Sequence, residues 1–493
     1  MALHQQGRLA EADPLYSQII AAEPAHRQAL RLQGILARQC GEHARSVQLL
    51  SRLVELVADD PVPHNELGLT YLASGELYAA QQALGDALAC DADNLQARVN
   101  LGAVLQRRGY FAAAAEHYAT CLDSVPDDLE IHCNLANALL EAGQGERAMR
   151  QIDRALEISP STPALLANRG AILLGLERYA DAAAVLEQAL ALEPADDMAL
   201  LNLALARRHL DEPAAAAAAL TGAVRINPAN ARAVADLANT EMQLGQNEQA
   251  LRRCRDFLAR FPGERLVLAT YSYALTETGE HEQALALQGL DELVTIVDCP
   301  APDGFADLAT FNARLADYLL THESRIHDPV RKATTGGTQT GELDAAEHPL
   351  IAAFSQIADA AIEQTVARWR QLGFAGHPVM AYAAEHRALR TWGTVLEAGG
   401  AQTPHMHPLG WISGVYYVQL PAGMRANDPA AGALEFGRPP AHMHAPGEPD
   451  LRIIEPVAGR LVLFPSWCFH RTLPFSGNGQ RISVAFDVVP LAR

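Results

Sequence analysis

The sequence predicts a multidomain protein in which an all-α solenoid of helix pairs precedes a jelly-roll β domain with supporting helices. Two observations support this prediction. A 34-residue period runs through the first 290 residues, and short alternating strands separated by Gly/Pro turns follow from about residue 380. A chain of 493 residues is also too long for one ordinary core, so we expect it to divide into domains.

The 34-residue period is visible in three columns of residues. Proline recurs at Pro126, Pro160, Pro194, Pro228 and Pro262. Small residues form a second column, which holds Gly34, Gly68, Gly102, Ala136, Gly170, Ala204, Ala238 and Ser272. A third column holds Ala12, Ser46, Ala80, Ala114, Ala148, Ala182, Ala216, Ala250 and Ala284. We expect each unit to be two amphipathic helices, with small residues where the paired helices approach closely and the proline ending the second helix.

These columns resemble the tetratricopeptide repeat (TPR) family over residues 1–290, with eight to nine repeats of 34 residues. Residue 1 is expected to fall inside a first, incomplete repeat. In the same register lie Asn100, Asn134, Asn168 and Asn202, followed by Asp236. This column resembles the asparagine ladder of the O-GlcNAc transferase TPR array, which implies a concave face that binds a peptide backbone. Asparagine suits this role because its amide both donates and accepts hydrogen bonds. The alternative is that asparagine is only a tolerated polar residue on an exposed helix face.

The repeat pattern ends near residue 290, and two further segments are predicted after it. Residues 291–303, with a short β-like run and two prolines, are expected to form a linker. Residues 304–378 are expected to be a helical prelude, with amphipathic helices in 305–322 and 348–373 and a polar loop at 332–347 between them. The jelly roll is predicted for residues 379–493.

Three histidines and one arginine near the strands form the candidate site. His405 and His407 lie one residue apart just before the strand-like run "WISGVYYVQLP". His470 follows the buried-looking run "GRLVLFPSW", and Arg481 begins the last strand eleven residues later. Two ligands one residue apart come from one strand end, and the third comes from a strand adjacent in space. Such a set holds a metal on one triangular face and leaves the opposite positions open.

This pattern resembles the double-stranded β-helix (jelly roll) of 2-oxoglutarate/Fe(II) dioxygenases, including the prolyl-hydroxylase-like branch, over residues 304–493. The resemblance implies Fe(II), 2-oxoglutarate and O₂ as cofactors, with His405 and His470 as imidazole ligands. His407 stands at the third position, where most members have Asp or Glu. Arg481 is implied to bind the distal carboxylate of 2-oxoglutarate, for which a planar guanidinium is well shaped. Tyr417 and, less directly, Ser413 are implied to contact the cosubstrate.

Other residues offer alternatives to this ligand set. Glu397 and Glu435 are carboxylates that would replace His407 as the third ligand, although we expect them to lie elsewhere. A second His-x-His pair, His442 and His444, lies in a proline-rich loop without a suitable following strand. We expect this pair to be loop residues near the entrance of the site.

The expected function is the hydroxylation of a protein or peptide side chain that the TPR array recruits. Two alternatives remain: a TPR scaffold with an inactive jelly roll, and an oxygenase of a small molecule or glycan. The net charge of −20 argues against nucleic acid as a partner, and no stretch reaches 18 apolar residues, which argues against a membrane span. Seven scattered cysteines favour a reducing cytoplasm. The oligomeric state is not predicted.

Overall fold

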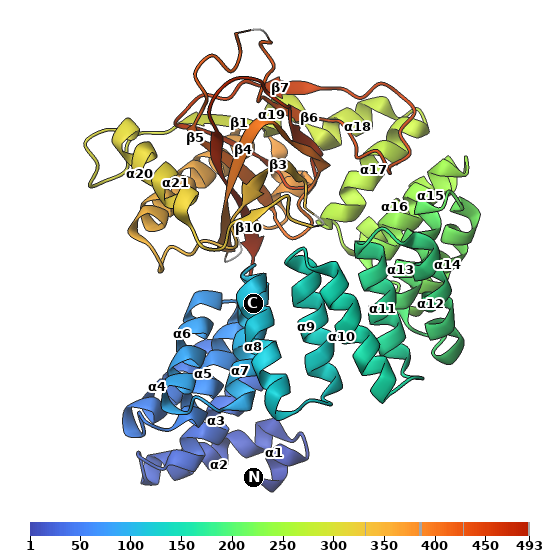
Figure 1. Ribbon diagram of the computed structural model, residues 1–493. Helices are drawn as coiled ribbons and strands as arrows, with labels where there is room; N and C mark the ends of the chain where they lie inside the picture. Colours follow the sequence, from blue (N-terminus) through green and yellow to red (C-terminus); the bar gives the residue numbers. More distant parts are fainter. Residues whose placement is uncertain (331, 384–386, 427, 492–493) are drawn as a thin grey trace. The chain divides into compact units, whose positions relative to one another are not determined.

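The computed structural model describes residues 1–330, 332–383, 387–426 and 428–491. The chain forms two compact units, Met1–Pro160 and Ser161–Arg493, which we describe separately (Figure 1). Within the described residues, no helix is both long and apolar enough to span a membrane.

The first unit consists of consecutive antiparallel helices. They are α1 (Ala2–Gln5), α2 (Leu9–Ala22), α3 (Arg27–Gln39), α4 (His43–Leu56), α5 (Pro61–Ser74), α6 (Leu77–Cys90), α7 (Leu95–Arg107), α8 (Phe111–Ser124), α9 (Leu129–Glu141) and α10 (Gly145–Ile158). The first helix of most pairs begins with a capping side chain, and these caps also repeat every 34 residues. For example, Asn94 and Asp128 each accept a hydrogen bond from the amide three residues later.

Small residues lie where the two helices of a pair meet, as the sequence predicts. A Cβ atom on Gly68 would lie 2.6 Å from Leu84 Cγ, and one on Gly170 would lie 2.5 Å from Leu186 Cγ. Both distances are shorter than any ordinary carbon contact, so a larger side chain would push the helices apart. The partner residue of each pair is fully buried. The small-residue column therefore sets the spacing of the helices within a repeat.

The second unit begins with further repeat helices. They are α11 (Pro163–Gly175), α12 (Tyr179–Leu192), α13 (Asp197–His209), α14 (Pro213–Ile226), α15 (Ala231–Gln243), α16 (Asn247–Arg260), α17 (Arg265–Glu277) and α18 (His281–Gln288). The turn within most repeats contains a glycine with positive φ, such as Gly245 (φ 74°). In two repeats this position holds Glu177 (φ 58°) and Asp211 (φ 59°), side chains for which the left-handed conformation is unfavourable.

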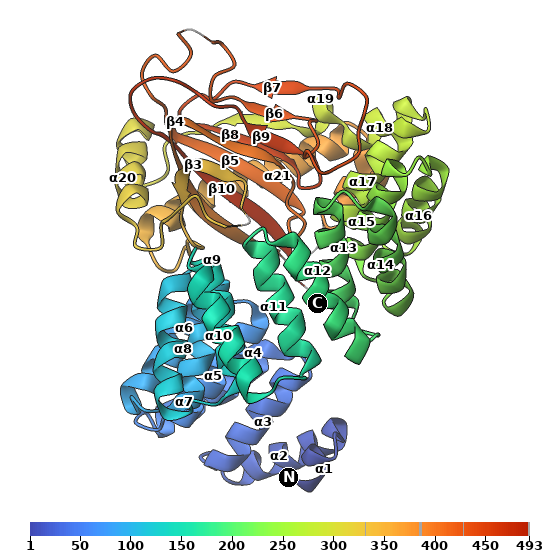
Figure 2. The ribbon, with the colours of Figure 1, turned by 45° about the vertical axis from the view of Figure 1, so that its right-hand side comes forward.

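A curled, mostly antiparallel sheet forms the rest of the second unit (Figure 2). Its strands are β1 (Thr295–Asp298), β2 (Ile326–His327), β3 (Thr334–Gln339), β4 (Arg387–His405), β5 (Ile412–Gln419), β6 (Leu434–Phe436), β7 (Arg452–Ile454), β8 (Arg460–Pro465), β9 (His470–Thr472) and β10 (Arg481–Pro490). The strand order is β1-β8-β5-β10-β4-β9-β6-β7, and β3 also pairs with β4. The helical elements are α19 (Leu290–Leu293), α20 (Leu308–Thr321), α21 (Pro349–Gln371), η1 (Phe374–Gly376) and η2 (Pro378–Met380).

The long strand β4 connects the two halves of the sheet. Its first half pairs with β10 from Arg387 to Leu396, and its end pairs with β9 at Gln402 and His405. Between these stretches lie Gly399 (φ 83°) and Gly400. A Cβ on Gly400 would lie 2.4 Å from the carbonyl oxygen of Gly336, so only glycine fits this crossing. The irregularity redirects the strand and brings its last residue, His405, against β9.

The predicted fold class, a helical solenoid followed by a jelly-roll domain with supporting helices, is confirmed by these elements. One local expectation is wrong. The polar stretch 332–347, predicted as a loop, contains β3, whose backbone pairs with β4. Its sequence TTGGTQ has no alternation of apolar and polar residues, so this strand forms through its backbone hydrogen bonds to β4 and not through burial of an apolar face. In addition, β1 lies in the segment predicted as a linker and pairs with β8 from Thr295 to Asp298.

Candidate metal centre

Three histidines meet where β4 and β9 pair. His405, the last residue of β4, is the direct cross-strand partner of His470, the first residue of β9. His407 follows in the next loop. One ring nitrogen from each of the three lies within 4.8 Å of the others. Three nitrogens bound to one ion at about 2.1 Å lie about 3.0–3.6 Å apart, so the longest separation must shorten by up to about 1–2 Å for the triad to close on a metal.

The second nitrogen of each ring is already held. Nδ1 of His405 donates to the carbonyl of Thr403 (2.7 Å), and Nδ1 of His470 donates to the carbonyl of Cys468 (3.1 Å). Nδ1 of His407 donates to the carboxylate of Asp487 (3.0 Å). Because these acceptors have no proton to give, each Nδ1 must carry the hydrogen. In its neutral form each ring therefore has its lone pair on Nε2, which is the arrangement that metal-binding histidines use.

The protonation state also suits a metal. Burial, reinforced by the neighbouring His407, lowers the pKa of His405 to about 3. Burial and the two other rings lower the pKa of His470 as well. Both rings are therefore neutral at pH 7, with free lone pairs. The chemistry of this donor set fits a divalent transition metal.

Asp487 contacts the triad but was not among the candidate residues predicted from the sequence. Its carboxylate accepts from His407 and, at 2.6 Å, from the hydroxyl of Ser413. The Ser413 hydroxyl also lies 3.0 Å from that of Ser466. Ser413 and Asp487 are cross-strand partners on β5 and β10. A signal was available: Asp487 interrupts the apolar run "VAFDVV" and shares the strand face of Arg481, six residues earlier.

A row of buried polar groups crosses the sheet near Arg481; we call it the unsatisfied row. It consists of Thr394 Oγ1, the Tyr417 hydroxyl and Arg481 Nη2, which make no close hydrogen bond to another part of the described chain; Tyr417 and Arg481 interact with each other. Ser483 of β10 pairs with Thr394 on β4 and with Tyr417 on β5, so all three groups share one sheet region. Thr394 was not predicted from the sequence.

Arg481 is the charged member of the unsatisfied row. It is fully buried, its Nε donates to the Gly432 carbonyl (3.1 Å), and its guanidinium carbon lies 5.0 Å from the Tyr417 ring centroid. Burial lowers the pKa of Arg481 and raises the pKa of Tyr417. No carboxylate of the described chain pairs with this guanidinium, and a buried, uncompensated cation is costly. The row therefore fits an anionic ligand with carboxylate oxygens.

The alternative carboxylates do not contact the triad. Glu435 is buried on β6, where Arg471 (2.6 Å) and Arg438 (2.7 Å) neutralise it. Glu397 is exposed. Trp392 is half-buried, and its ring stacks on His407 with centroids 5.6 Å apart.

The last repeat contacts the loops that carry the triad. Arg265, at the start of α17, donates to the carbonyls of Pro408 (3.1 Å) and Leu409 (3.4 Å), which follow His407 directly. The Tyr273 hydroxyl, also on α17, donates to the carbonyl of Gly437 (2.9 Å). These repeat side chains therefore help to hold the loops around the histidines.

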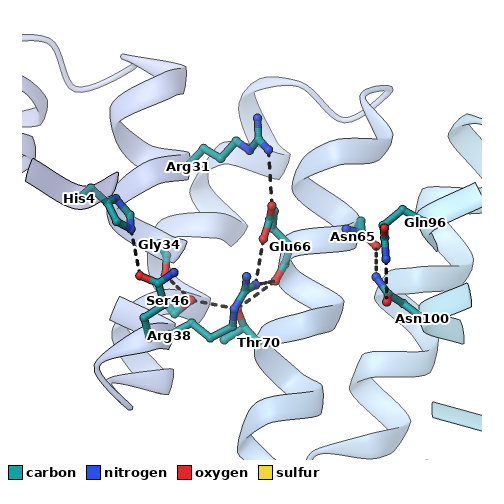
Figure 3. Close-up of polar contacts among 11 residues, drawn as sticks. His4, Arg31, Gly34, Arg38, Ser46, Asn65, Glu66, Thr70, Gln96 and Asn100 are labelled. Atoms are coloured by element: carbon teal, nitrogen blue, oxygen red, sulfur yellow. Dashed lines mark hydrogen bonds and ion pairs between the residues drawn. The ribbon is translucent and has the colours of Figure 1, made fainter. Parts of the chain in front are cut away.

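The asparagine column is divided between the two units. Asn100 in the first unit is already engaged, since its amide donates to Asn65 (2.8 Å) and accepts from Gln96 (3.2 Å), as Figure 3 shows. Glu66 holds the equivalent position one repeat earlier and is bound by Arg38 (2.9 Å). Asn134, Asn168 and Asn202 are half-buried and make no side-chain hydrogen bond within the described chain.

His442 and His444 lie away from the triad, in the loop between β6 and β7. Their backbone groups bind repeat side chains: the carbonyl of His442 accepts from Arg208 (3.1 Å), and the amide of His444 donates to Asn239 (2.9 Å). Among the described residues, the one histidine, cysteine and carboxylate cluster with metal-binding spacing is the triad.

Family models match both parts of the chain. A model described as "Putative 2OG-Fe(II) oxygenase" matches residues 390–487. Two tetratricopeptide repeat models match residues 105–170 and 207–266, and residues 1–61 and 168–231. No curated protein matches the chain.

The chain is also similar to parts of several solved structures. The APC/C hetero-tetramer Cut9-Hcn1 has 18% identity and a TM-score of 0.40, covering 54% of this chain and 52% of that one. A tetratricopeptide repeat protein from Parabacteroides merdae has 18% identity and a TM-score of 0.38, covering 46% and 90%. A TPR protein from Thermus thermophilus has 23% identity and a TM-score of 0.33, covering 37% and 99%.

Proposed function

We propose that this chain, which combines tetratricopeptide repeats with a domain matching the 2OG-Fe(II) oxygenase family, is a 2-oxoglutarate- and Fe(II)-dependent dioxygenase. The observation that carries the proposal is the common state of the three histidines. Each Nδ1 is bound to a fixed acceptor, and each Nε2 is left with a free lone pair. We also propose the predicted domain boundaries: repeats in 1–290, a linker in 291–303 whose residues Thr295–Asp298 join the sheet as β1, and the oxygenase domain in 304–493.

In this proposal, His405, His407 and His470 bind Fe(II) through Nε2. When bound, the ion together with 2-oxoglutarate and O₂ supplies the oxidation of a C–H bond to C–OH, releasing succinate and CO₂. Three neutral imidazoles leave the full +2 charge on the ion, which favours a doubly negative cosubstrate. Asp487 fixes the orientation and tautomer of His407, and Ser413 orients Asp487.

The unsatisfied row supports a place for the cosubstrate. We propose that the guanidinium of Arg481 binds its distal carboxylate and that Tyr417 and Thr394 donate further hydrogen bonds to it. A bound carboxylate would satisfy three buried polar groups at once and neutralise a buried cation. Ser413, predicted as a pocket residue, would then act through Asp487.

We propose a protein or peptide as the substrate, with hydroxylation of a side chain. The support is the attachment of the oxygenase domain to repeats whose column of Asn134, Asn168 and Asn202 leaves amides free for a peptide backbone. We further propose a cytoplasmic location, which suits the seven free cysteines.

The test of the enzyme proposal is an anaerobic titration of the full chain with Fe(II), with and without 2-oxoglutarate. We expect one ion per chain in the wild type and at least about tenfold weaker binding in each of His405→Ala, His407→Ala and His470→Ala. No metal uptake by the wild type would leave the chain as a TPR scaffold with an inactive jelly roll.

A second assay addresses the substrate class. Succinate release is measured with peptide mixtures and, separately, with metabolite and glycan mixtures. Stimulation by peptides alone supports the proposal, whereas stimulation by metabolites or glycans alone would replace the peptide with a small-molecule substrate.

A further inference from the structure

The loop between β6 and β7 lies on the repeats (Figure 2). Its two ends meet at the sheet, because a Cβ on Gly437 would lie 1.9 Å from the carbonyl oxygen of Asp450. The residues between them leave the sheet as a closed excursion, a loop type that often carries function. This loop contacts α13 and α15, the first helices of two consecutive repeats.

Asn239 of α15 binds the loop through its backbone. Its Oδ1 accepts from the amide of His444 (2.9 Å), and its Nδ2 donates to the carbonyl of His442 (3.3 Å). One side-chain amide therefore satisfies a main-chain acceptor and a main-chain donor two residues apart, next to a turn in which the amide of Met443 donates to the carbonyl of Pro440 (2.9 Å). Because both partners are main-chain groups, this contact is indifferent to the side chains of the bound segment.

Other contacts complete this binding site. Nη2 of Arg208, on α13, also donates to the His442 carbonyl (3.1 Å), and Nη1 of the same guanidinium donates to Asp236 (3.1 Å). Asn239 itself is 3% exposed. The side chains of Met443 and Ala445 pack against the core to which α15 contributes. The repeats thus contain a built site for a short peptide, filled by the chain's own residues 441–445.

The filled site is connected to the metal centre. The loop begins directly after Phe436, the cross-strand partner of His470. The next residue, Gly437, bonds to the carbonyl of Phe469 and receives the Tyr273 hydroxyl. His442 lies six positions after Phe436, a path of at most about 20 Å when extended. A peptide bound at Asn239 therefore has residues within reach of the triad.

We propose that residues 441–445 are an internal peptide ligand of the α13–α15 face and that a segment of the polypeptide substrate replaces them there. The substrate part of this proposal rests on the proposed oxygenase function; the binding part does not. Because the loop is tethered, it competes at an effective concentration of millimolar order. An external peptide therefore binds the intact protein weakly and binds tightly once the loop is released.

The experiment uses the full chain in a metal chelator and a fluorescein-labelled synthetic peptide with the sequence of residues 438–448, followed by fluorescence anisotropy. His444→Pro removes the amide that Asn239 accepts, whereas the matched control His444→Ala keeps it. We expect the peptide to bind His444→Pro at least about tenfold more tightly than His444→Ala or the wild type. A labelled peptide carrying proline at the position of His444 should not bind any of them.

A second substitution identifies the receiving site. Two changes are added to the His444→Pro protein, one at a time: Asn239→Asp, which keeps the acceptor but loses the donor, and Arg208→Ala. Each should weaken peptide binding again by about tenfold. Hydrogen exchange of residues 438–448 supplies an independent readout, with faster exchange in His444→Pro than in His444→Ala. Equal peptide affinity of His444→Pro and His444→Ala, or no effect of the Asn239 and Arg208 changes, would overturn the proposal.

Iron titration of the same proteins separates this inference from the enzyme proposal. Normal Fe(II) binding with no peptide effect defeats the internal ligand alone. Loss of iron binding in the wild type defeats the oxygenase, while the peptide measurements, made in chelator, still decide the binding site.

Discussion

The carboxylate of Asp487 accepts a hydrogen bond from Nδ1 of His407 at 3.0 Å and so joins the last strand of the sheet to the loop after β4. A second hydrogen bond, from Ser413, fixes that carboxylate in turn. The third histidine is therefore oriented by a residue 80 positions away along the chain, and its Nε2 is the atom left free.

Substitution of Asp487 by asparagine tests this orientation. Asp487→Asn removes the charge that stabilises the Nδ1–H tautomer, so we expect Fe(II) affinity to fall about 10- to 100-fold with little change in the far-UV circular dichroism spectrum. Asp303→Asn, at an exposed position, is the control and should bind iron normally. Equal affinities in the two variants would show that Asp487 does not position His407.

Arg481→Lys tests the unsatisfied row. Lysine keeps the charge but loses the planar fork, so the Kd for 2-oxoglutarate of the anaerobic Fe(II)-loaded protein should rise at least about tenfold. Fe(II) affinity without 2-oxoglutarate should change less than about twofold. Arg425→Lys, in a surface ion pair with Glu455, provides the control. An unchanged Kd in Arg481→Lys would remove the guanidinium from cosubstrate binding.

Arg265→Ala tests whether the last repeat supports the metal centre. The change removes two hydrogen bonds to the carbonyls that follow His407. We expect a loss of about 1 kcal/mol in loop ordering, seen as a roughly fivefold weaker Kd for Fe(II). Arg260→Ala, at the exposed end of α16, should leave this Kd unchanged. If both variants bind iron like the wild type, the loop is held without Arg265.

Two repeat turns should become more stable with glycine. Glu177 and Asp211 have φ values of 58° and 59°, where a side chain is unfavourable. Glu177→Gly or Asp211→Gly should raise the free energy of unfolding by about 0.5–1 kcal/mol, measured by urea denaturation. The converse change, Gly143→Ala, should lower it by a similar amount, because φ there is 76° although no atom lies within 4 Å of the added Cβ.

The metal-free protein should lose stability in mild acid. The pKa of His405 in the folded chain is about 3, and that of His470 is also lowered, whereas unfolded histidine titrates near 6.5. Below about pH 6.5 the unfolded state therefore binds protons that the folded state does not, and the stability contributed by the neutral rings falls toward pH 3. The slope is up to about 1.4 kcal/mol per pH unit for each ring. Urea midpoints measured in chelator from pH 8 to pH 5 should fall less steeply in His405→Asn than in the wild type.

The repeats were predictable because their determinants are local. Each helix pair lies within 34 consecutive residues, and its small residues, caps and terminal proline recur at fixed positions. The histidine triad was also predictable in part, because His405, His407 and His470 each lie next to the end of a predicted strand, and two of these strand ends pair in the structure. The contacts of Asn100 with Asn65 and Gln96 were not, because a column of identical residues does not reveal what its neighbours already bind.

Strand pairing decided the rest of the site. The registers of β10 with β4 and β5 determine which side chains lie beside Asp487, Thr394 and Arg481. No short stretch of sequence specifies these registers. The strand β3 was missed for the same reason: its polar residues carry no alternation, and only backbone pairing with β4 orders them.

By itself, the sequence determined the helical repeats, the placement of the three histidines beside predicted strand ends, and the position of Arg481 at the start of the last strand. The tertiary structure alone decided which groups hold each Nδ1, which buried polar groups remain without partners, and that Asn239 binds residues 442 and 444 of the same chain. The physical reason is the range of the interactions. Helix periodicity is fixed by neighbours within a few residues, whereas hydrogen bonds between distant segments exist only after the chain has folded.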